Sequence, residues 1–291
     1  MNKYVLVTDS SCDLSEAMVR ELDLSVLPLS FHIGENSYKD HPDRREMDPK
    51  DFYDRIRSGA MPTTSAVNPE GYIEHLTPFL EQGQDVLVLA FSSGLSTTCQ
   101  SAQIAAAELS ERYPERKLLV VDTLCASMGQ GLLCWHAAQK RLAGESMEAV
   151  RDWCEENKLR LCHWFTVDDL MHLKRGGRVS AATAVVGTML QIKPVLHVDD
   201  EGRLINVSKA RGRRASLDAL VSKAGELATE PAAQRLMLIS HSDCETDAQY
   251  VADHIKEKYG VQRIELNNIG PVIGSHTGPG CVALFFLGEH R

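Results

Sequence analysis

The chain contains no long hydrophobic run, and this absence argues against a membrane-spanning helix. Its longest apolar stretches, such as 86–91, are far shorter than the roughly 20 residues that a transmembrane helix needs. The N-terminus has one lysine and only a short apolar run before Thr8 and Asp9, which is too short for the core of a signal peptide. We therefore expect a soluble, cytoplasmic protein.

The sequence also lacks the usual metal-binding patterns. Its eight cysteines form no C-x-x-C pair, no cysteine and histidine cluster has zinc-finger spacing, and there is no H-E-x-x-H motif. Most cysteines lie in apolar runs, as Cys134 and Cys281 do, which is typical of small buried side chains with free thiols. Free thiols indicate a reducing compartment, and we expect no metal and no cofactor.

Positive charge is in deficit. There are 31 Lys and Arg residues against 40 Asp and Glu, which gives a formal net charge of -9. A protein that binds nucleic acid normally carries the opposite balance, so nucleic acid is not the expected ligand. With 43% hydrophobic and 24% charged residues over 291 positions, the composition is that of a globular protein with one large or two ordinary domains.

The first 160 residues alternate short apolar runs with helical patterns. We predict strands at 4–10, 26–33, 85–91 and 117–122, and helices at 15–22, 98–109, 126–142 and 146–158. Asp48 and Asn68 are each followed by proline, which marks the start of a further helix. This alternation predicts an α/β domain at 1–160, with a parallel sheet between helices.

The second half has a different pattern. We predict strands at 160–167 and 235–241, late strands near 263–270 and 281–288, and helices at 211–228 and 245–259. The segment 191–210 reads as two strands joined by the tight turn D-D-E-G, which predicts an antiparallel hairpin. Hairpins mixed with crossover units indicate an α+β domain with a mixed sheet at 161–291.

Two loops are rich in hydroxyl groups. The segment 91–98, F-S-S-G-L-S-T-T, lies between a predicted strand and a predicted helix, where hydroxyl and backbone N–H groups can bind an anion. The alternative is plain capping of the helix by Ser96 or Thr97. The loop is neither a Walker loop nor a nucleophile elbow, because it lacks the Gly-Lys-Ser ending and the second glycine. The second loop is 61–65, M-P-T-T-S, which is either a surface loop or a partner of the first loop in binding one anion.

Three further features remain open. The glycine-rich segment 270–280 must turn sharply or approach another group closely, and His276 at its centre is either structural or part of a site. Nine Lys and Arg residues but only three acids lie between Lys174 and Arg214, and this basic stretch is either a solvated face or a surface for phosphate or an acidic partner. Asp9 and Asp13 either cap the first helix or touch a metal.

Taken together, these segments resemble the DegV family. The matches occur in order over nearly the whole chain, at V-L-V-T-D-S-S-C-D-L-S (5–15), P-T-T-S (62–65), S-S-G-L-S-T-T-C-Q-S-A (92–102), 167–179, I-K-P-V-L (192–196), and G-P-V with H-T-G-P-G (270–280). The family's usual Q-P after T-T-S is Ala66-Val67 here, and Thr97 and Cys99 replace its usual Gly and Tyr. These departures bear on the surroundings of Thr64 and Ser96.

The resemblance implies a function. Similar members of this family bind a fatty acid between two domains and present it to a separate, ATP-using fatty acid kinase subunit, which forms the acyl phosphate. It implies that Thr64 and Ser96 bind the carboxylate of a long-chain fatty acid, with Ser93 and His276 close by. It also implies that Arg178 and Arg211 contact the kinase or handle the phosphoryl group. The chain is then a carrier and not an enzyme.

Three alternatives remain at this point. The family's fold is related to the substrate subunit of dihydroxyacetone kinase, which would make the chain a phosphotransfer enzyme. Ser93 or Ser96 could act with His276 in a hydrolase. The protein could also be a regulator with an empty pocket that binds partners through the basic stretch 174–214.

Overall fold

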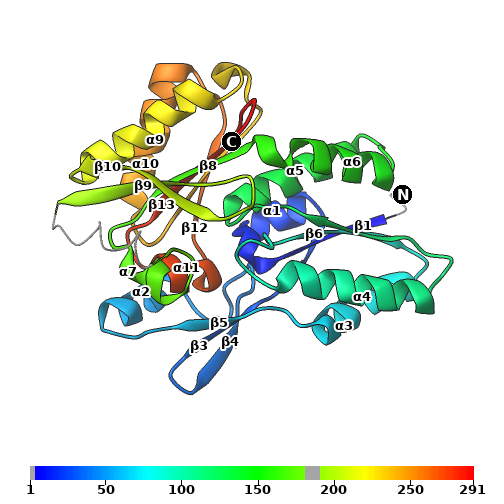
Figure 1. Cartoon of the computed structure of the whole chain (residues 1–291). Helices are drawn as coiled ribbons and strands as arrows, with labels where there is room; N and C mark the ends of the chain where they lie inside the picture. The colour runs from blue at the N-terminus through cyan, green and yellow to red at the C-terminus, as the bar shows by residue number, and fades with distance from the viewer. Residues whose placement is uncertain (1–3, 181–190) are drawn as a thin grey trace.

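The computed structural model describes residues 4–180 and 191–291, and its helices pack around three β-sheets (Figure 1). The first sheet has four parallel strands in the order β2-β1-β6-β7. Its strands are β1 (Tyr4–Asp9), β2 (Leu24–Leu27), β6 (Asp85–Ala90) and β7 (Leu118–Asp122). Three of them, β1, β6 and β7, were predicted from continuous apolar runs, which are typical of parallel strands buried on both faces.

Helices cover both faces of this sheet. They are α1 (Glu16–Glu21), α3 (Pro69–Glu81), α4 (Thr98–Arg112), α5 (Met128–Leu142) and α6 (Met147–Asn157). Because side chains alternate along a strand, Val86 and Val88 of β6 belong to the apolar cluster that contains residues of α3 and α4. Leu87 and Leu89 belong instead to the cluster that contains residues of α5 and α6.

A small antiparallel sheet departs from the prediction. It has the order β4-β3-β5, with β3 (Ser30–Ile33), β4 (Asn36–Lys39) and β5 (Thr63–Ser65), and α2 (Pro49–Arg57) lies between β4 and β5 in the sequence. The prediction of a single strand at 26–33 is therefore wrong, because this segment belongs to two strands, β2 and β3. The chain leaves the parallel sheet after β2, passes through Pro28, which cannot donate a ladder hydrogen bond, and enters the small sheet as β3.

The second large sheet has six strands of mixed direction. Its order is β10-β9-β8-β13-β11-β12, formed by β8 (Leu161–Thr166), β9 (Ile192–Val198), β10 (Leu204–Arg211), β11 (Met237–His241), β12 (Ile264–Asn268) and β13 (Val282–Leu287). The pair β9 and β10 is the predicted antiparallel hairpin. The helices α9 (Arg213–Leu227) and α10 (Glu245–Tyr259) pack on one face of this sheet. The predicted fold class is thus confirmed, with an N-terminal parallel sheet and a C-terminal mixed sheet.

Two short helices, α7 (Met171–Arg175) and α11 (Pro271–Thr277), pack against each other (Figure 1). The glycine-rich segment 270–280 was expected to turn or to approach another group closely, and most of it forms α11. The close approaches are nevertheless present, because a Cβ atom on Gly274 would lie 2.5 Å from the Tyr53 hydroxyl. Gly278 and Gly280 follow the helix with positive φ angles of 68° and 80°, a conformation that favours glycine.

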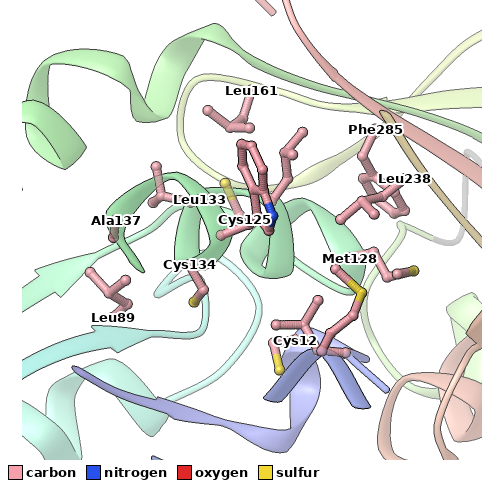
Figure 2. Close-up of a cluster of buried hydrophobic side chains, with 14 of the residues drawn as sticks. Cys12, Leu89, Cys125, Met128, Leu133, Cys134, Ala137, Leu161, Leu238 and Phe285 are labelled. Carbon is pink, nitrogen blue, oxygen red and sulfur yellow. The ribbon is translucent and has the colours of Figure 1, made fainter. Parts of the chain in front are cut away.

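The helix α5 lies between the two large sheets. Its apolar side chains belong to one buried cluster that also contains Leu89 of β6 and Leu161, Leu238 and Phe285 of the six-stranded sheet (Figure 2). The strands of the first two sheets all precede residue 123, and those of the third all follow residue 160. The exact division into domains at 160 and 161 stays a prediction, because one core spans it. No helix in the described ranges is both long and apolar enough to cross a membrane.

Candidate functional site

A cavity of about 720 Å³ opens where β6 ends, beside α4, α7 and α11. Ligands of α/β proteins usually bind at this carboxyl end of parallel strands. Its lining residues are Leu29, Thr64, Ser65, Ala66, Phe91, Ser93, Leu95, Ser96, Thr97, Gln100, Gln103, Ala126, Leu173, Arg178, Leu204, Val272, Ile273, His276 and Thr277. The set combines hydroxyl groups, one cation and a wall of aliphatic side chains.

The structure brings together five of the six residues singled out from the sequence, which are Thr64, Ser93, Ser96, Arg178 and His276. Both hydroxyl-rich loops therefore face one cavity, as the anion-binding hypothesis requires. The sixth residue, Arg211, does not line the cavity. It lies at the exposed end of the edge strand β10.

The loop before α4 positions Ser96. The Ser96 hydroxyl accepts a hydrogen bond of 3.2 Å from the Thr98 N–H and shares one of 2.9 Å with the Thr98 hydroxyl. Ser96, which precedes the N-cap residue Thr97, thus binds the first N–H of the helix while it also lines the cavity. The Thr97 side chain makes no capping bond. The buried Asp9 carboxylate holds the start of the loop by accepting the Phe91 N–H at 2.9 Å. Capping and ligand binding are thus compatible roles for Ser96.

A hydrogen bond joins the second loop to α11. Thr64 Oγ1 and His276 Nε2 lie 2.8 Å apart, although 212 residues separate them in the sequence. Burial, with a smaller contribution from Arg178, lowers the pKa of His276 to about 4. The imidazole is therefore neutral at pH 7. Its Nδ1 atom is buried and has no hydrogen-bond partner among the described residues.

The Arg178 guanidinium reaches the cavity beside His276. It donates hydrogen bonds to the carbonyl oxygens of Gly176 and of Leu95, the latter at 3.1 Å. Burial lowers the pKa of Arg178 from its usual value, but an arginine remains charged at pH 7. Within the described part of the chain no carboxylate lies within 4 Å of this side chain, so none of the described residues neutralises its charge.

Several cations of the basic stretch 174–214 form ion pairs in the structure, some of them with acids that lie outside the stretch in the sequence. Asp168, which precedes it, lies 2.7 Å from Lys193, and Asp247, which follows it, lies 2.8 Å from Arg213. Arg203 pairs with Glu201 at 3.2 Å. In the remainder, the Arg214 guanidinium stacks 3.4 Å from the ring centroid of Tyr250. The cations without an ion pair or ring contact in the described segments are Lys174, Arg175, Arg178, Lys209 and Arg211.

The two early aspartates have roles that differ from the prediction. Asp9 caps a short 3-10 helix at Ser10–Cys12, and Ser15 caps α1. Asp13 instead accepts the N–H of Gly270, 257 positions away, at 2.8 Å. Across residues 4–180 and 191–291, no group of three His, Cys, Asp or Glu side chains is placed to hold a metal ion.

An apolar slot of about 50 Å³ adjoins the cavity and shares Ala126, Leu204 and Thr277 with it. It lies between the start of α5 and the six-stranded sheet, and its other walls are mostly hydrophobic. They are formed by Ser127, His163, Phe165, Val198, Ile269, Cys281, Ala283 and Phe285. The slot extends the cavity from its polar mouth toward the core between the sheets.

Sequence reasoning missed two polar residues of the cavity, Gln100 and Gln103 on α4. Their spacing of three residues places them on one helix face, directly after the Ser96 loop. This spacing could have predicted that both side chains face the same site as Ser96. The aliphatic wall from Val272 and Ile273 was also missed, because the glycine-rich segment was not expected to be helical.

Comparison with known proteins identifies the family. Residues 3–289 match the model of the DegV family of uncharacterised proteins. A DegV domain-containing protein from Clostridium perfringens is 47% identical over 291 residues, which is 100% of this chain and 99% of the relative. These matches extend over nearly the whole chain.

Solved structures agree with this result. A DegV family protein from Thermus thermophilus, described as binding fatty acid, is 33% identical with a TM-score of 0.84, over 98% of this chain and 99% of that one. The fatty acid kinase B3 protein of Streptococcus pneumoniae, loaded with linoleic acid, has a TM-score of 0.86 over 99% and 100% of the two chains. It is 18% identical and therefore supports the fold alone. On the family match and the 47% identity, the chain belongs to the DegV family.

Proposed function

We propose that the protein binds one long-chain fatty acid in the cavity and presents its carboxylate to a separate kinase subunit, which forms the acyl phosphate. The observation that carries the proposal is the convergence of Thr64, Ser96, His276 and Arg178 at the polar mouth of one cavity. The fatty acid binding described for the 33% identical Thermus thermophilus protein supports it.

The polar mouth suits a carboxylate. The hydroxyl groups of Thr64 and Ser96 each have one proton to donate. That proton is available to an anion when His276 Nε2–H donates to Thr64 and the Thr98 hydroxyl donates to Ser96. Arg178 supplies a positive charge that no carboxylate of the described chain neutralises. A hydrogen bond to a charged group contributes about 1.5–3 kcal/mol, so two or three such donors hold the head group firmly in place.

The rest of the cavity suits an acyl chain. Leu29, Leu173, Val272 and Ile273 line it, and the adjoining apolar slot leads toward the core. Each buried methylene contributes about 0.8 kcal/mol, so affinity should increase with chain length until the slot ends. The slot is too narrow for a long acyl chain in this structure. Binding of such a chain would require a local separation of α5 from the six-stranded sheet.

The geometry favours a carrier over a hydrolase. A serine nucleophile needs a histidine base that a third group orients, but His276 is hydrogen-bonded to Thr64 and its Nδ1 has no partner in the described chain. Burial also raises the pKa of the cysteine thiols, to about 12 for Cys99, which makes them poor nucleophiles. The chemical step is therefore assigned to the kinase.

The kinase step rests on the family motifs and on the position of Arg211. This exposed arginine lies on the edge strand β10, and Leu204 of the same strand lines the cavity. Leu204 and Arg211 are the two ends of this eight-residue strand, so a partner that contacts both Arg211 and the cavity mouth would have to extend along β10. Arg178, inside the cavity, is placed to contact the carboxylate or the phosphoryl group that replaces one of its oxygens.

The test uses two neighbouring threonines on β5. Thr64 lines the cavity, whereas Thr63 is exposed and does not line it. Thr64→Val should weaken binding of a C16 or C18 fatty acid by about 10- to 100-fold, the loss of one hydrogen bond to a charged group. Thr63→Val, the matched control, should bind as the unmodified protein does. Calorimetric titration measures both, and equal affinities for the two variants would remove Thr64 from the site.

A further inference from the structure

We propose that Asp13 is a positioning residue for the head-group site. With Asp40 and Arg44 it fixes helix α11, and so determines where His276 meets a bound carboxylate. The proposal rests on the proposed function, because it concerns recognition of that carboxylate.

Asp13 joins segments that are far apart in the sequence. The residue is 1% exposed. One carboxylate oxygen accepts the Gly270 N–H at 2.8 Å, and the other accepts the Ser127 hydroxyl at 2.6 Å. The Asn267 side chain donates to the Asp13 carbonyl at 2.7 Å. Asp13 therefore connects the loop after β1 with the start of α5 and the start of α11.

Asp40 and Arg44 complete the cluster. Arg44 is hydrogen-bonded to Asp40 and lies 3.8 Å from Asp13, and Asp40 accepts the Val272 N–H at 3.5 Å. Gly270 lies against all three side chains. A Cβ atom there would be 2.4 Å from Arg44, 2.8 Å from Asp40 and 2.9 Å from Asp13. The first backbone groups of α11 thus fit closely against a buried ion cluster.

This cluster bears directly on the cavity. No side chain of α11 or of its N-cap residue Gly270 caps the helix, so two carboxylates from another part of the chain bind its first N–H groups. The same helix places Ile273, His276 and Thr277 on the cavity wall. Because α11 has seven residues, a shift at Gly270 would move His276 relative to Thr64.

The composition of the cluster argues for positioning over stability. Burial raises the pKa of Asp13 to about 7, an effect that the positive charge of Arg44 opposes and the negative charge of Asp40 reinforces. Two buried carboxylates share one arginine, and an imperfectly compensated buried charge is unfavourable for folding. A hydrophobic contact would stabilise this junction at lower cost. The carboxylates instead hold the start of α11 in one orientation, because their hydrogen bonds fix two N–H groups and one hydroxyl group at defined points.

The experiment compares two ligands of one chain length, a C16 fatty acid and the C16 alcohol. Asp13→Asn keeps the size of the side chain but replaces one acceptor by a donor that faces an N–H or a hydroxyl. Affinity for the acid should fall at least about tenfold, as for the loss of one hydrogen bond to a charged group. Affinity for the alcohol should change less than about twofold, because the acyl contacts remain.

Controls separate the possible outcomes. Asn157 is another buried polar residue, with hydrogen bonds to Trp153 and Arg160 and no part in the cavity, so Asn157→Ala should leave the acid-to-alcohol ratio unchanged. Gly270→Ala and Ser127→Ala disturb the same cluster and should lower the ratio of acid to alcohol affinity. If Asp13→Asn does not fold, these two variants test the proposal in its place. An equal loss for both ligands, or none, overturns the positioning role. If the unmodified protein does not prefer the acid, the proposed function itself fails.

Discussion

Arg178 and Arg211 lie in different surroundings, although from the resemblance to the family we expected both to contact the partner or handle the phosphoryl group. Arg178 is half-buried, lines the cavity and donates to the carbonyl oxygens of Gly176 and Leu95. Arg211 is exposed. A buried charge acts on the ligand beside it, whereas an exposed charge acts mainly on the approach of a charged partner.

The two arginines should therefore differ in experiment. Arg178→Ala should weaken fatty acid binding by about 10- to 100-fold, since it removes a charged group from the carboxylate. Arg211→Ala should leave lipid affinity unchanged and slow acyl phosphate formation with a kinase, and raising the salt concentration should reproduce part of that loss through screening. Lipid titration and a kinase assay on the same samples measure both effects. An unchanged kinase rate in Arg211→Ala would show that Arg211 does not contact the partner and that this end of β10 is only exposed to solvent.

The residues of the site were largely predictable, but their arrangement was not. The loop at Ser93 is visible in the sequence because small polar residues follow a predicted apolar strand, and Thr64 is visible as part of the hydroxyl cluster T-T-S after Pro62. The hydrogen bond between Thr64 and His276 crosses 212 positions, and no local pattern specifies such a contact. Asp13 was interpreted from its neighbours alone, whereas its main partner, Gly270, comes from the other end of the chain.

At the level of elements, α5 carries much of the packing between the two large sheets. Leu133 is fully buried in the cluster that includes strands of both sheets (Figure 2). Leu142, at the end of the same helix, is 57% exposed. The two leucines differ in burial but share one helix and one side-chain type, so they form a matched pair.

Replacement by alanine should separate them. Leu133→Ala should lower the free energy of unfolding by about 2–5 kcal/mol, the usual effect of a cavity in a core. Leu142→Ala should change it by less than about 0.5 kcal/mol, as for an exposed substitution. Urea denaturation followed by circular dichroism gives both values. A loss below about 0.5 kcal/mol in Leu133→Ala as well would mean that the apolar core does not depend on this helix.

The elements themselves were predicted where one physical signal dominates. Buried parallel strands read as continuous apolar runs, and the D-D-E-G turn marked the β9–β10 hairpin. The small sheet escaped prediction because β4, N-S-Y-K, and β5, T-T-S, have neither an apolar run nor clear alternation. The helix α11 escaped because glycine disfavours helices, while its close packing against Tyr53 and the Asp13 cluster leaves no room for larger residues at Gly270 and Gly274.

At the level of the whole molecule, one apolar cluster contains residues from β1 to β13. Two domains that share a core should not unfold independently, since each would expose the surface that the other buries. We therefore expect a single cooperative unfolding transition. Tryptophan fluorescence, which reports on Trp135 in α5, Trp153 in α6 and Trp164 in β8, and far-ultraviolet circular dichroism should give the same midpoint. Two separated transitions would instead support independent domains at 1–160 and 161–291.

The hydrogen bond between Thr64 and His276 also has a consequence for synthesis on the ribosome. The cavity receives one wall early in translation and another only when α11 has been made. At roughly 5–20 residues per second, the 212 positions between these side chains correspond to about 10–40 s. A nascent chain thus displays hydroxyl groups without a complete binding site, and under the proposed function loading with lipid would wait until translation is nearly finished.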